Sequence, residues 1–428
     1  MKFIRTVPGL LLATTALVAV ATALYIQAGD RVRAGVRTEG PAPVKAAAVE
    51  PGGPTRRNAR EGKVEVDPTR TFTHYRVGNN SVIAIYADGS VLWLGTSGGI
   101  VRYDTLTHAF KTYDARQGLL SNGILYLGKL QGKISVGTYG GGLSLLDQDT
   151  QEWEHFGVSH GLGDAYVYDV LESSSADVWI ATGAGVSRIR AGAMRERAKW
   201  DHYTVKSTGG GLPNDRVYRI VEGKDGSVWF ATRGGVANFR NGKWKNWMDA
   251  EGLGARREGA KPGLASDAGA ARVQARDAEH AQEAQGASAR AVFERNHIAA
   301  LEVGDDGRVW AGTRNAGLAR FDGKAWRNYT VADGLPSNQI TALNFDGNGR
   351  LWIGTSDGLA VLDKGKFQVM TAAHGLMAEK VYSVLTTQDG GVWVGSFGGV
   401  THMRRPASRQ YIPPPASINT STSAPQSS

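Results

Sequence analysis

Histidine and acidic side chains are the residues of this chain that could supply acid–base chemistry. The sequence has 9 histidines and no cysteine, which excludes disulfides, thiolate metal sites and a cysteine nucleophile. His160 and His374 each precede a Gly-Leu pair, and His297 could act together with Glu379. A lyase or hydrolase would need such groups to converge on one point. The sequence has no phosphate-binding loop, His-Glu-x-x-His helix or nucleophile elbow, and we expect no cofactor, no metal and no catalytic residues.

A second set of residues has the chemistry of ligand binding. Arginines could hold a carboxylate or a sulfate through two parallel hydrogen bonds, and aromatic rings could stack on a sugar or another flat ligand. The alternative is that the arginines are only solvated and that Asn and Asp in the same loops cap turns. The candidate ligand-binding residues are Tyr139, Tyr166, Arg216, Arg233, His297, Arg314, Gln339, Asp357, Lys380 and Phe397.

A repeated Trp-x-Gly-Thr motif must position these residues. Its copies begin at Trp93, Trp179, Trp229, Trp310, Trp352 and Trp393, with a degenerate copy at Ser135. Successive copies are 41 to 50 residues apart, except for one step of 81. Propeller blades of four strands repeat every ~40 to 45 residues. The sequence therefore predicts an all-β fold, a seven-bladed β-propeller over residues 71–403.

The strands of one unit follow from alternation and turn residues. In the sixth unit we expect strands over 338–345, 351–355 and 358–362 and a fourth that opens at Gly365. Asp-Gly pairs such as Asp225-Gly226 predict hairpin turns in which glycine takes a positive φ. A calcium site is the alternative interpretation, but each turn offers only one or two carboxylates.

The outermost strand of a unit carries two aromatic residues three positions apart, as in Trp326 and Tyr329. No such strand follows the seventh motif, whereas Phe72–Tyr75 supplies one ahead of the first. We therefore expect the N-terminal strand to complete the last blade, which closes the ring and removes exposed sheet edges. In such a ring, the loops that follow the outer strand and those that follow the second strand share one face. The candidate binding residues lie in these loops, around the mouth of the central channel.

The combination of Gly334-Leu335-Pro336-Ser337-Asn338 with Leu351-Trp352-Ile353-Gly354-Thr355 and Gly358-Leu359 resembles the two-component-regulator propeller repeat. That repeat is typical of the periplasmic sensor regions of hybrid histidine kinases. The resemblance covers about residues 72–403 and implies a sensor or binding propeller outside the cytoplasm. Family members continue into a further β-domain, a second membrane span and a kinase, whereas this sequence ends at Ser428. The expectation is a stand-alone propeller that signals through a partner.

The flanks of the repeat region differ from it in composition. Residues 6–29 carry no charge and predict a signal peptide over 1–28 or an uncleaved membrane anchor. Residues 29–70 predict a flexible linker, 254–295 a low-complexity insertion, and 404–428 a disordered tail. The flanks hold nearly all of the net charge of +9, since the repeat region has 35 basic and 34 acidic residues. This distribution argues against nucleic-acid binding.

These observations predict an exported protein that is periplasmic, at the cell surface or anchored to the inner membrane. We expect a non-enzymatic sensor propeller that binds a small molecule, an oligosaccharide or a signalling protein such as a membrane kinase. The alternative is a propeller lyase or hydrolase that resembles streptogramin lyase, which also has seven blades with Trp-centred repeats.

Overall fold

The computed structural model describes residues 61–63, 72–248, 253 and 297–404. The chain divides into two compact units, 1–55 and 56–428, and every described residue belongs to the second. The predicted signal peptide or anchor, most of the linker, the insertion at 254–295 and the tail beyond Arg404 lie outside the described residues. Within the described ranges, no helix has the length and apolar character needed to cross a membrane.

Antiparallel sheets make up nearly all of the described chain. Five of them have four strands in sequence order. Their strands are β6 (Ile124–Leu130), β7 (Lys133–Thr138), β8 (Leu143–Leu146) and β9 (Trp153–Phe156); β10 (Val167–Glu172), β11 (Val178–Thr182), β12 (Gly185–Ile189) and β13 (Trp200–Tyr203); β14 (Val217–Glu222), β15 (Val228–Thr232), β16 (Gly235–Arg240) and β17 (Lys243–Trp247); β18 (Ile298–Val303), β19 (Val309–Thr313), β20 (Leu318–Phe321) and β21 (Trp326–Tyr329); and β22 (Ile340–Phe345), β23 (Leu351–Thr355), β24 (Gly358–Asp363) and β25 (Lys366–Met370). We call these sheets blades 2 to 6.

The remaining sheet has seven strands and comprises two further blades. Its strands are β1 (Glu61–Lys63), β2 (Phe72–Asp88), β3 (Val91–Thr96), β4 (Gly99–Asp104), β5 (Ala109–Tyr113), β26 (Val381–Thr386) and β27 (Val392–Met403). The second half of β2 pairs with β3 and forms the inner strand of blade 1. The first half pairs with the end of β27, with Phe72 opposite Met403, and is the outer strand of blade 7.

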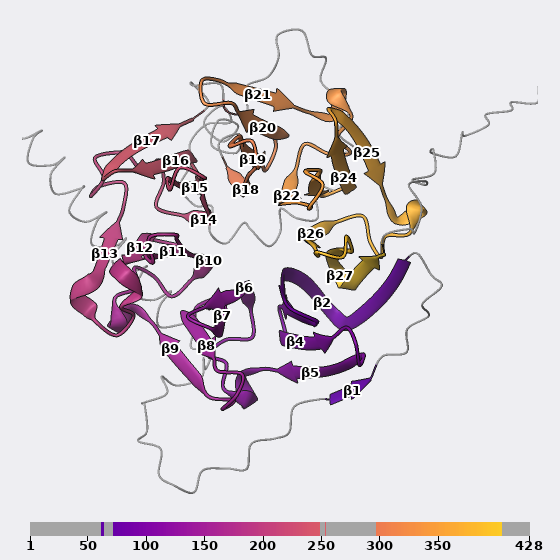
Figure 1. Cartoon of the computed structure of the whole chain (residues 1–428), viewed down its shortest axis with the longest axis horizontal. Helices are drawn as coiled ribbons and strands as arrows, with labels where there is room; N and C mark the ends of the chain where they lie inside the picture. Colours follow the sequence, from indigo (N-terminus) through magenta and orange to yellow (C-terminus); the bar gives the residue numbers. More distant parts are fainter. Residues whose placement is uncertain (1–60, 64–71, 249–252, 254–296, 405–428) are drawn as a thin grey trace, which may run out of the picture. The chain divides into compact units, whose positions relative to one another are not determined.

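The inner strands form a closed ring. Each contacts the next in the order β2, β6, β10, β14, β18, β22 and β26, and β26 contacts β2 again (Figure 1). The predicted all-β propeller is therefore confirmed, and the described sheets are consistent with seven blades. The prediction that Phe72–Tyr75 completes the last blade is also correct, because the β2–β27 pairing joins the two ends of the ring.

Hydrophobic side chains gather at the junctions between neighbouring blades. The motif tryptophans are all buried, with exposed fractions of 9% or less. Trp352 of blade 6, for example, packs with Val381 and Val392 of blade 7. Its indole Nε1 donates a hydrogen bond to Asp346 Oδ2 at 3.0 Å, so its polar atom is satisfied inside the core. Blade 2 has Ser135 in place of the tryptophan, and leucines such as Leu130 and Leu145 fill its junction with blade 3.

The turn after the second strand has the same construction in six blades. In blade 6, Thr355 Oγ1 donates to the carbonyl oxygen of Gly358 at 2.8 Å, and Gly358 takes φ 123°. A Cβ on Gly358 would lie 2.6 Å from the carbonyl oxygen of Met370 in the outer strand, so no larger residue fits. The corresponding threonines that make this bond are Thr96, Thr138, Thr182, Thr232 and Thr313.

The strand bounds predicted for blade 6 agree with the structure to within one residue, except at the start of the inner strand. That strand begins at Ile340 rather than Asn338. Asn338 Oδ1 accepts a hydrogen bond from the Val331 amide at 3.0 Å and so caps the preceding turn. That turn is the 3-10 helix η7 (Val331–Asp333), and η1 (Ala115–Gln117), η2 (Val158–His160) and η8 (Ala372–His374) precede inner strands in the same way. Two further 3-10 helices, η3 (Arg190–Gly192) and η4 (Arg197–Lys199), lie between β12 and β13.

The aspartates of the hairpin turns are engaged in hydrogen bonds. Asp346 accepts from the Asn348 and Arg350 amides at 2.9 Å and 3.0 Å and from Arg350 Nε at 2.7 Å. Gly349 takes the positive φ expected of the turn, 75°. In the described part of the chain, no three His, Asp or Glu side chains gather as a metal site would require.

Replacement of Trp352 by Ala should remove ~3 to 5 kcal/mol from the free energy of unfolding, because it leaves a cavity at a blade junction. Urea denaturation of the purified chain measures this loss. Trp326, a half-buried tryptophan of outer strand β21, is the matched control, and Trp326→Ala should cost clearly less. Equal losses for the two variants would contradict the junction argument.

Candidate ligand-binding site

One face of the propeller brings together the two sets of loops in which the candidate residues lie. In five blades, the residue that follows the turn threonine donates its backbone N–H to the carbonyl oxygen of a residue just ahead of the inner strand. Four of these bonds are Gly183 to Tyr166 (3.3 Å), Arg233 to Arg216 (3.0 Å), Arg314 to His297 (2.9 Å) and Ser356 to Gln339 (3.1 Å). In blade 2, Tyr139 donates to Gly123 at 2.8 Å. The expected convergence of both loop sets is therefore correct, and main-chain bonds fix it.

Aromatic rings from four neighbouring blades lie close together at this face. Tyr139 and Tyr166 meet edge to face, with ring centroids 4.6 Å apart. Tyr218 stacks on His297 with centroids 4.7 Å apart and the ring planes 12° from parallel. The ring of Tyr168 meets the ring of Tyr218 edge to face, with centroids 5.2 Å apart. We call Tyr139, Tyr166, Tyr168, Arg216, Tyr218, Arg233, His297 and Arg314 the mouth cluster.

Sequence reasoning missed Tyr168 and Tyr218. Both occupy the second position of an inner strand, where the pairing with the next strand shifts register at a β-bulge. A bulge re-aims a side chain, so strict alternation does not predict where these two point. Superposition of the repeats could have found them, because Tyr382 of blade 7 holds the same position.

The positive charges of three arginines of the mouth cluster act on the imidazole of His297. Burial, with the positive charges of Arg314, Arg233 and Arg216 acting in the same direction, lowers the pKa of His297 to about 3. The imidazole is therefore neutral near pH 7 and adds no positive charge of its own. The cluster thus offers several guanidinium groups beside the faces and edges of aromatic rings. This arrangement suits a ligand that carries an anion on a flat or apolar body.

The other four predicted residues contact residues outside the mouth cluster. Lys380 lies over the ring of Tyr382, its Nζ 5.2 Å from the ring centroid. Asp357 accepts a hydrogen bond from Ser356 Oγ at 3.1 Å. Phe397 is 54% exposed and pairs with Ser81 where β27 meets β2. Gln339 contributes its carbonyl oxygen to the main-chain bond described above.

The histidines considered for catalysis have structural partners. His160 Nδ1 accepts from the Gly157 amide at 3.1 Å, and His374 Nδ1 accepts from the Thr371 amide at 3.2 Å. Both side chains therefore cap the 3-10 turn that precedes a Gly-Leu pair. Glu379 accepts from the Ala372 amide at 3.2 Å in the loop after η8, so it caps a turn and does not meet His297. No acid–base pair forms among these four residues.

A second polar group lies on the inner strands, beyond the mouth. Asp169 of β10 accepts from the Ile220 amide of β14 at 2.8 Å and lies 3.7 Å from Arg219 Nη1. Burial raises the pKa of Glu302 on β18 to about 7, against the opposing charge of Arg219. These groups belong to three neighbouring blades. A hydrogen bond and an ion pair join blades 3 and 4, and the charge of Arg219 acts on Glu302 of blade 5. These residues lie within the strands, where the repeat pattern does not distinguish them.

Replacement of His297 by Gln should weaken the pH dependence of stability. His297 titrates near 6.5 in an unfolded chain and near 3 in the folded protein. The unfolded state therefore binds the extra proton between these values, and stability is lost as the pH falls from 6.5 toward 3. At pH 5 this loss amounts to about 1 to 2 kcal/mol. Urea denaturation at pH 7.5 and pH 5 should show a smaller difference for His297→Gln than for the native chain, and identical differences would contradict the burial of His297.

Residues 211–234 and 334–357 match the family described as two component regulator propeller. Each match runs from the Gly-Leu-Pro loop, through the inner and second strands, to the turn that follows. Comparison with curated proteins found no match. The structure is similar to the extracellular domain of a B. thetaiotaomicron protein assigned as a hybrid two-component system, with 19% identity and a TM-score of 0.57. That similarity covers 78% of this chain and 42% of the other, so the chain spans about two fifths of the matched domain.

The structure is also similar to a catalytically inactive variant of virginiamycin B lyase from Staphylococcus aureus, solved with quinupristin. The identity is 11%, the TM-score is 0.54, and the match covers 77% of this chain and 98% of the lyase. At these identities the structural comparisons show the propeller fold alone. Together with the family match, they show a propeller in which residues 211–234 and 334–357 are repeats of the two component regulator propeller type.

Proposed function

We propose that this propeller is an extracytoplasmic sensor module that binds an anionic ligand at the mouth cluster and signals through a partner protein. The observation that carries the proposal is the convergence of Arg216, Arg233 and Arg314 around the Tyr218–His297 stack. Similarity to the extracellular domain of a two-component system supports a signalling role. The uncharged segment at residues 6–29 supports export.

The chemistry of the mouth cluster favours a carboxylate or sulfate on a flat body. Guanidinium groups bind such oxyanions through two parallel hydrogen bonds. Like charges held close together repel, so an anion between them would lower the energy of the site. Exposed edges and faces of the neighbouring tyrosines could contact a sugar ring or an aromatic ring. An acidic oligosaccharide combines both features.

In the proposed role, the mouth cluster binds a ligand and does not catalyse a reaction. His160, His374 and Glu379 cap turns, and His297 has arginines rather than carboxylates around it. A signal would then pass to a second protein, such as a membrane kinase. Cross-linking of the membrane-associated or secreted full chain, with and without ligand, would identify that protein.

Acidic oligosaccharides should raise the melting temperature of the purified chain by several degrees, because a ligand at ~100 times its Kd stabilises the folded state by ~2.7 kcal/mol. Scanning fluorimetry would compare acidic oligosaccharides with neutral ones of equal length. Arg216→Gln should abolish the shift. Arg190→Gln, an exposed arginine paired with Asp201 at 3.2 Å outside the mouth cluster, should leave it intact.

Two results would contradict this proposal. One is an equal shift with neutral and acidic ligands, which would remove the role of the arginines. The other is conversion of the ligand into a product, detected by mass spectrometry, which would favour the lyase alternative.

A further inference from the structure

A cleft of about 380 Å³ lies between blades 5 and 6. It is formed near the hairpin turns that join the first strand to the second and the third to the fourth, at the end of the strands opposite the mouth loops. Its lining combines aromatic side chains with charged ones of both signs: Trp310, Tyr329, Phe345, Arg320, Arg327, Lys364, Asp305 and Asp306. The volume is within the range of pockets that hold small molecules, ~300 to 1,000 Å³.

Arg320 is the residue of this cleft whose surroundings are unusual. Its guanidinium carbon lies over the ring of Trp310, 5.6 Å from the centroid, and its Nε is buried. That nitrogen has no hydrogen-bond partner among the described residues. Arg327 lies directly opposite Arg320 on the neighbouring strand β21. Two like charges in a cross-strand pair are destabilising, and a buried N–H without an acceptor adds a further cost.

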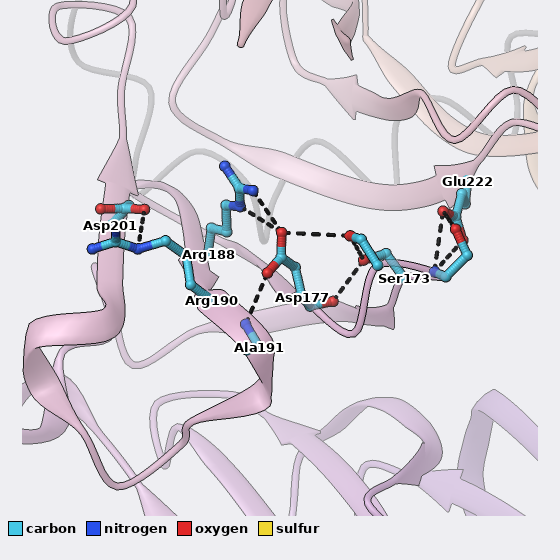
Figure 2. Close-up of polar contacts among 9 residues, drawn as sticks. Ser173, Asp177, Arg188, Arg190, Ala191, Asp201 and Glu222 are labelled. Carbon is cyan, nitrogen blue, oxygen red and sulfur yellow. Dashed lines mark hydrogen bonds and ion pairs between the residues drawn. The ribbon is translucent and has the colours of Figure 1, made fainter. Parts of the chain in front are cut away.

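Blade 3 has an arginine at the same position whose Nε has a carboxylate acceptor. Arg188 lies opposite Trp179 in the sheet, as Arg320 lies opposite Trp310. Arg188 Nε and Nη2 donate to Asp177 Oδ2 at 3.0 Å and 2.6 Å (Figure 2). Its cross-strand neighbour is Asp201, which carries the opposite charge. In blade 3, therefore, two carboxylates accompany the arginine that stacks on the tryptophan.

Blade 5 replaces both of these carboxylates with arginines. Asp177 immediately precedes the Val-Trp pair of blade 3, and Arg308 holds that place in blade 5. Arg327 takes the place of Asp201. The nearby acidic side chains are engaged elsewhere: Asp306 pairs with Arg308 at 2.6 Å, and Asp305 pairs with Lys224 at 3.1 Å. Asp322 accepts from the Lys324 and Ala325 amides at 2.9 Å and 3.0 Å, and these bonds, with the charge of Arg320, lower its pKa.

We propose that the cleft between blades 5 and 6 is a second ligand site, separate from the mouth cluster, that binds a small molecule with a carboxylate on an aromatic or apolar body. The carboxylate takes the place that Asp177 fills in blade 3 and accepts hydrogen bonds from Arg320. Arg327 and Lys364 add positive charge at the same cleft. Tyr329 and Phe345 contact the body of the ligand. The inference goes beyond the proposed function, because it uses none of the mouth residues.

The test uses 3-phenylpropionate as probe and 3-phenylpropanamide as its uncharged counterpart, titrated into the full chain by calorimetry. The acid should bind and the amide should bind at least tenfold more weakly, because the amide lacks the charge. Arg320→Met keeps an apolar chain over Trp310 and should weaken binding of the acid about tenfold or more. Arg188→Met, the same change in blade 3, should lower stability through the unpaired Asp177 and leave the Kd unchanged.

A double variant, Asp306→Ser with Arg308→Asp, tests the site by filling it. It reproduces Ser175 and Asp177 of blade 3, so the new carboxylate should pair with Arg320. The variant should lose binding of 3-phenylpropionate and still melt at or above the temperature of the native chain. This outcome separates loss of the site from loss of the fold.

Three results would overturn the proposal. They are no binding of 3-phenylpropionate to the native chain at millimolar concentration, equal binding of acid and amide, and binding that survives in both Arg320→Met and the double variant. Loss of binding in Arg216→Gln alone would place the probe at the mouth, which would support the proposed function and reject the second site. If acidic oligosaccharides do not bind at the mouth cluster, the test of the second site with 3-phenylpropionate is unaffected.

Discussion

The structure depends on a short hydrogen-bonded turn that follows the second strand of a blade. The turn threonine bonds to the carbonyl oxygen of a glycine, and that glycine packs directly on the main chain of the outer strand. In blade 7 the same contact is made across the ends of the chain, because a Cβ on Gly399 would lie 2.0 Å from the carbonyl oxygen of Tyr75. The turn therefore fixes the outer strand of each blade, including the one that closes the ring. It also sets the position of the next residue in the mouth loop.

This constraint separates the scaffold from the site. Threonine, glycine and the buried tryptophans are held by contacts that few other residues could make, and they repeat. The neighbouring loop positions have no such requirement, which is why blade 4 can place Arg216 and Arg233 where blade 3 has Tyr166 and Gly183. A ring of nearly identical blades thereby presents a face on which four neighbouring blades differ. The candidate ligand-binding residues are therefore the ones that differ from blade to blade.

The repeat explains why the sequence predicted the fold well and the site only in part. Strand order, ring closure by Phe72–Tyr75 and the gathering of both loop sets all follow from the period and from turn residues. The inner strands also contain a bulge after their first residue, which alternation does not reveal. Tyr168 and Tyr218 were missed for that reason. Lys380 and Phe397 lie in the equivalent loops of blade 7, where Lys380 contacts the ring of Tyr382 and Phe397 pairs with Ser81.

The arginines that stack on blade tryptophans show a further consequence of repetition. Arg188 and Arg320 occupy one structural position, and the stacking contact is kept in both. The carboxylate that accompanies Arg188 comes from a residue 11 positions earlier in the chain, and the corresponding residue of blade 5 is an arginine. Such a difference is invisible until the two blades are superposed, because neither arginine is unusual by itself. The blades of a repeat protein can therefore be compared with one another. Here the carboxylate that is present in blade 3 identifies the group that blade 5 lacks.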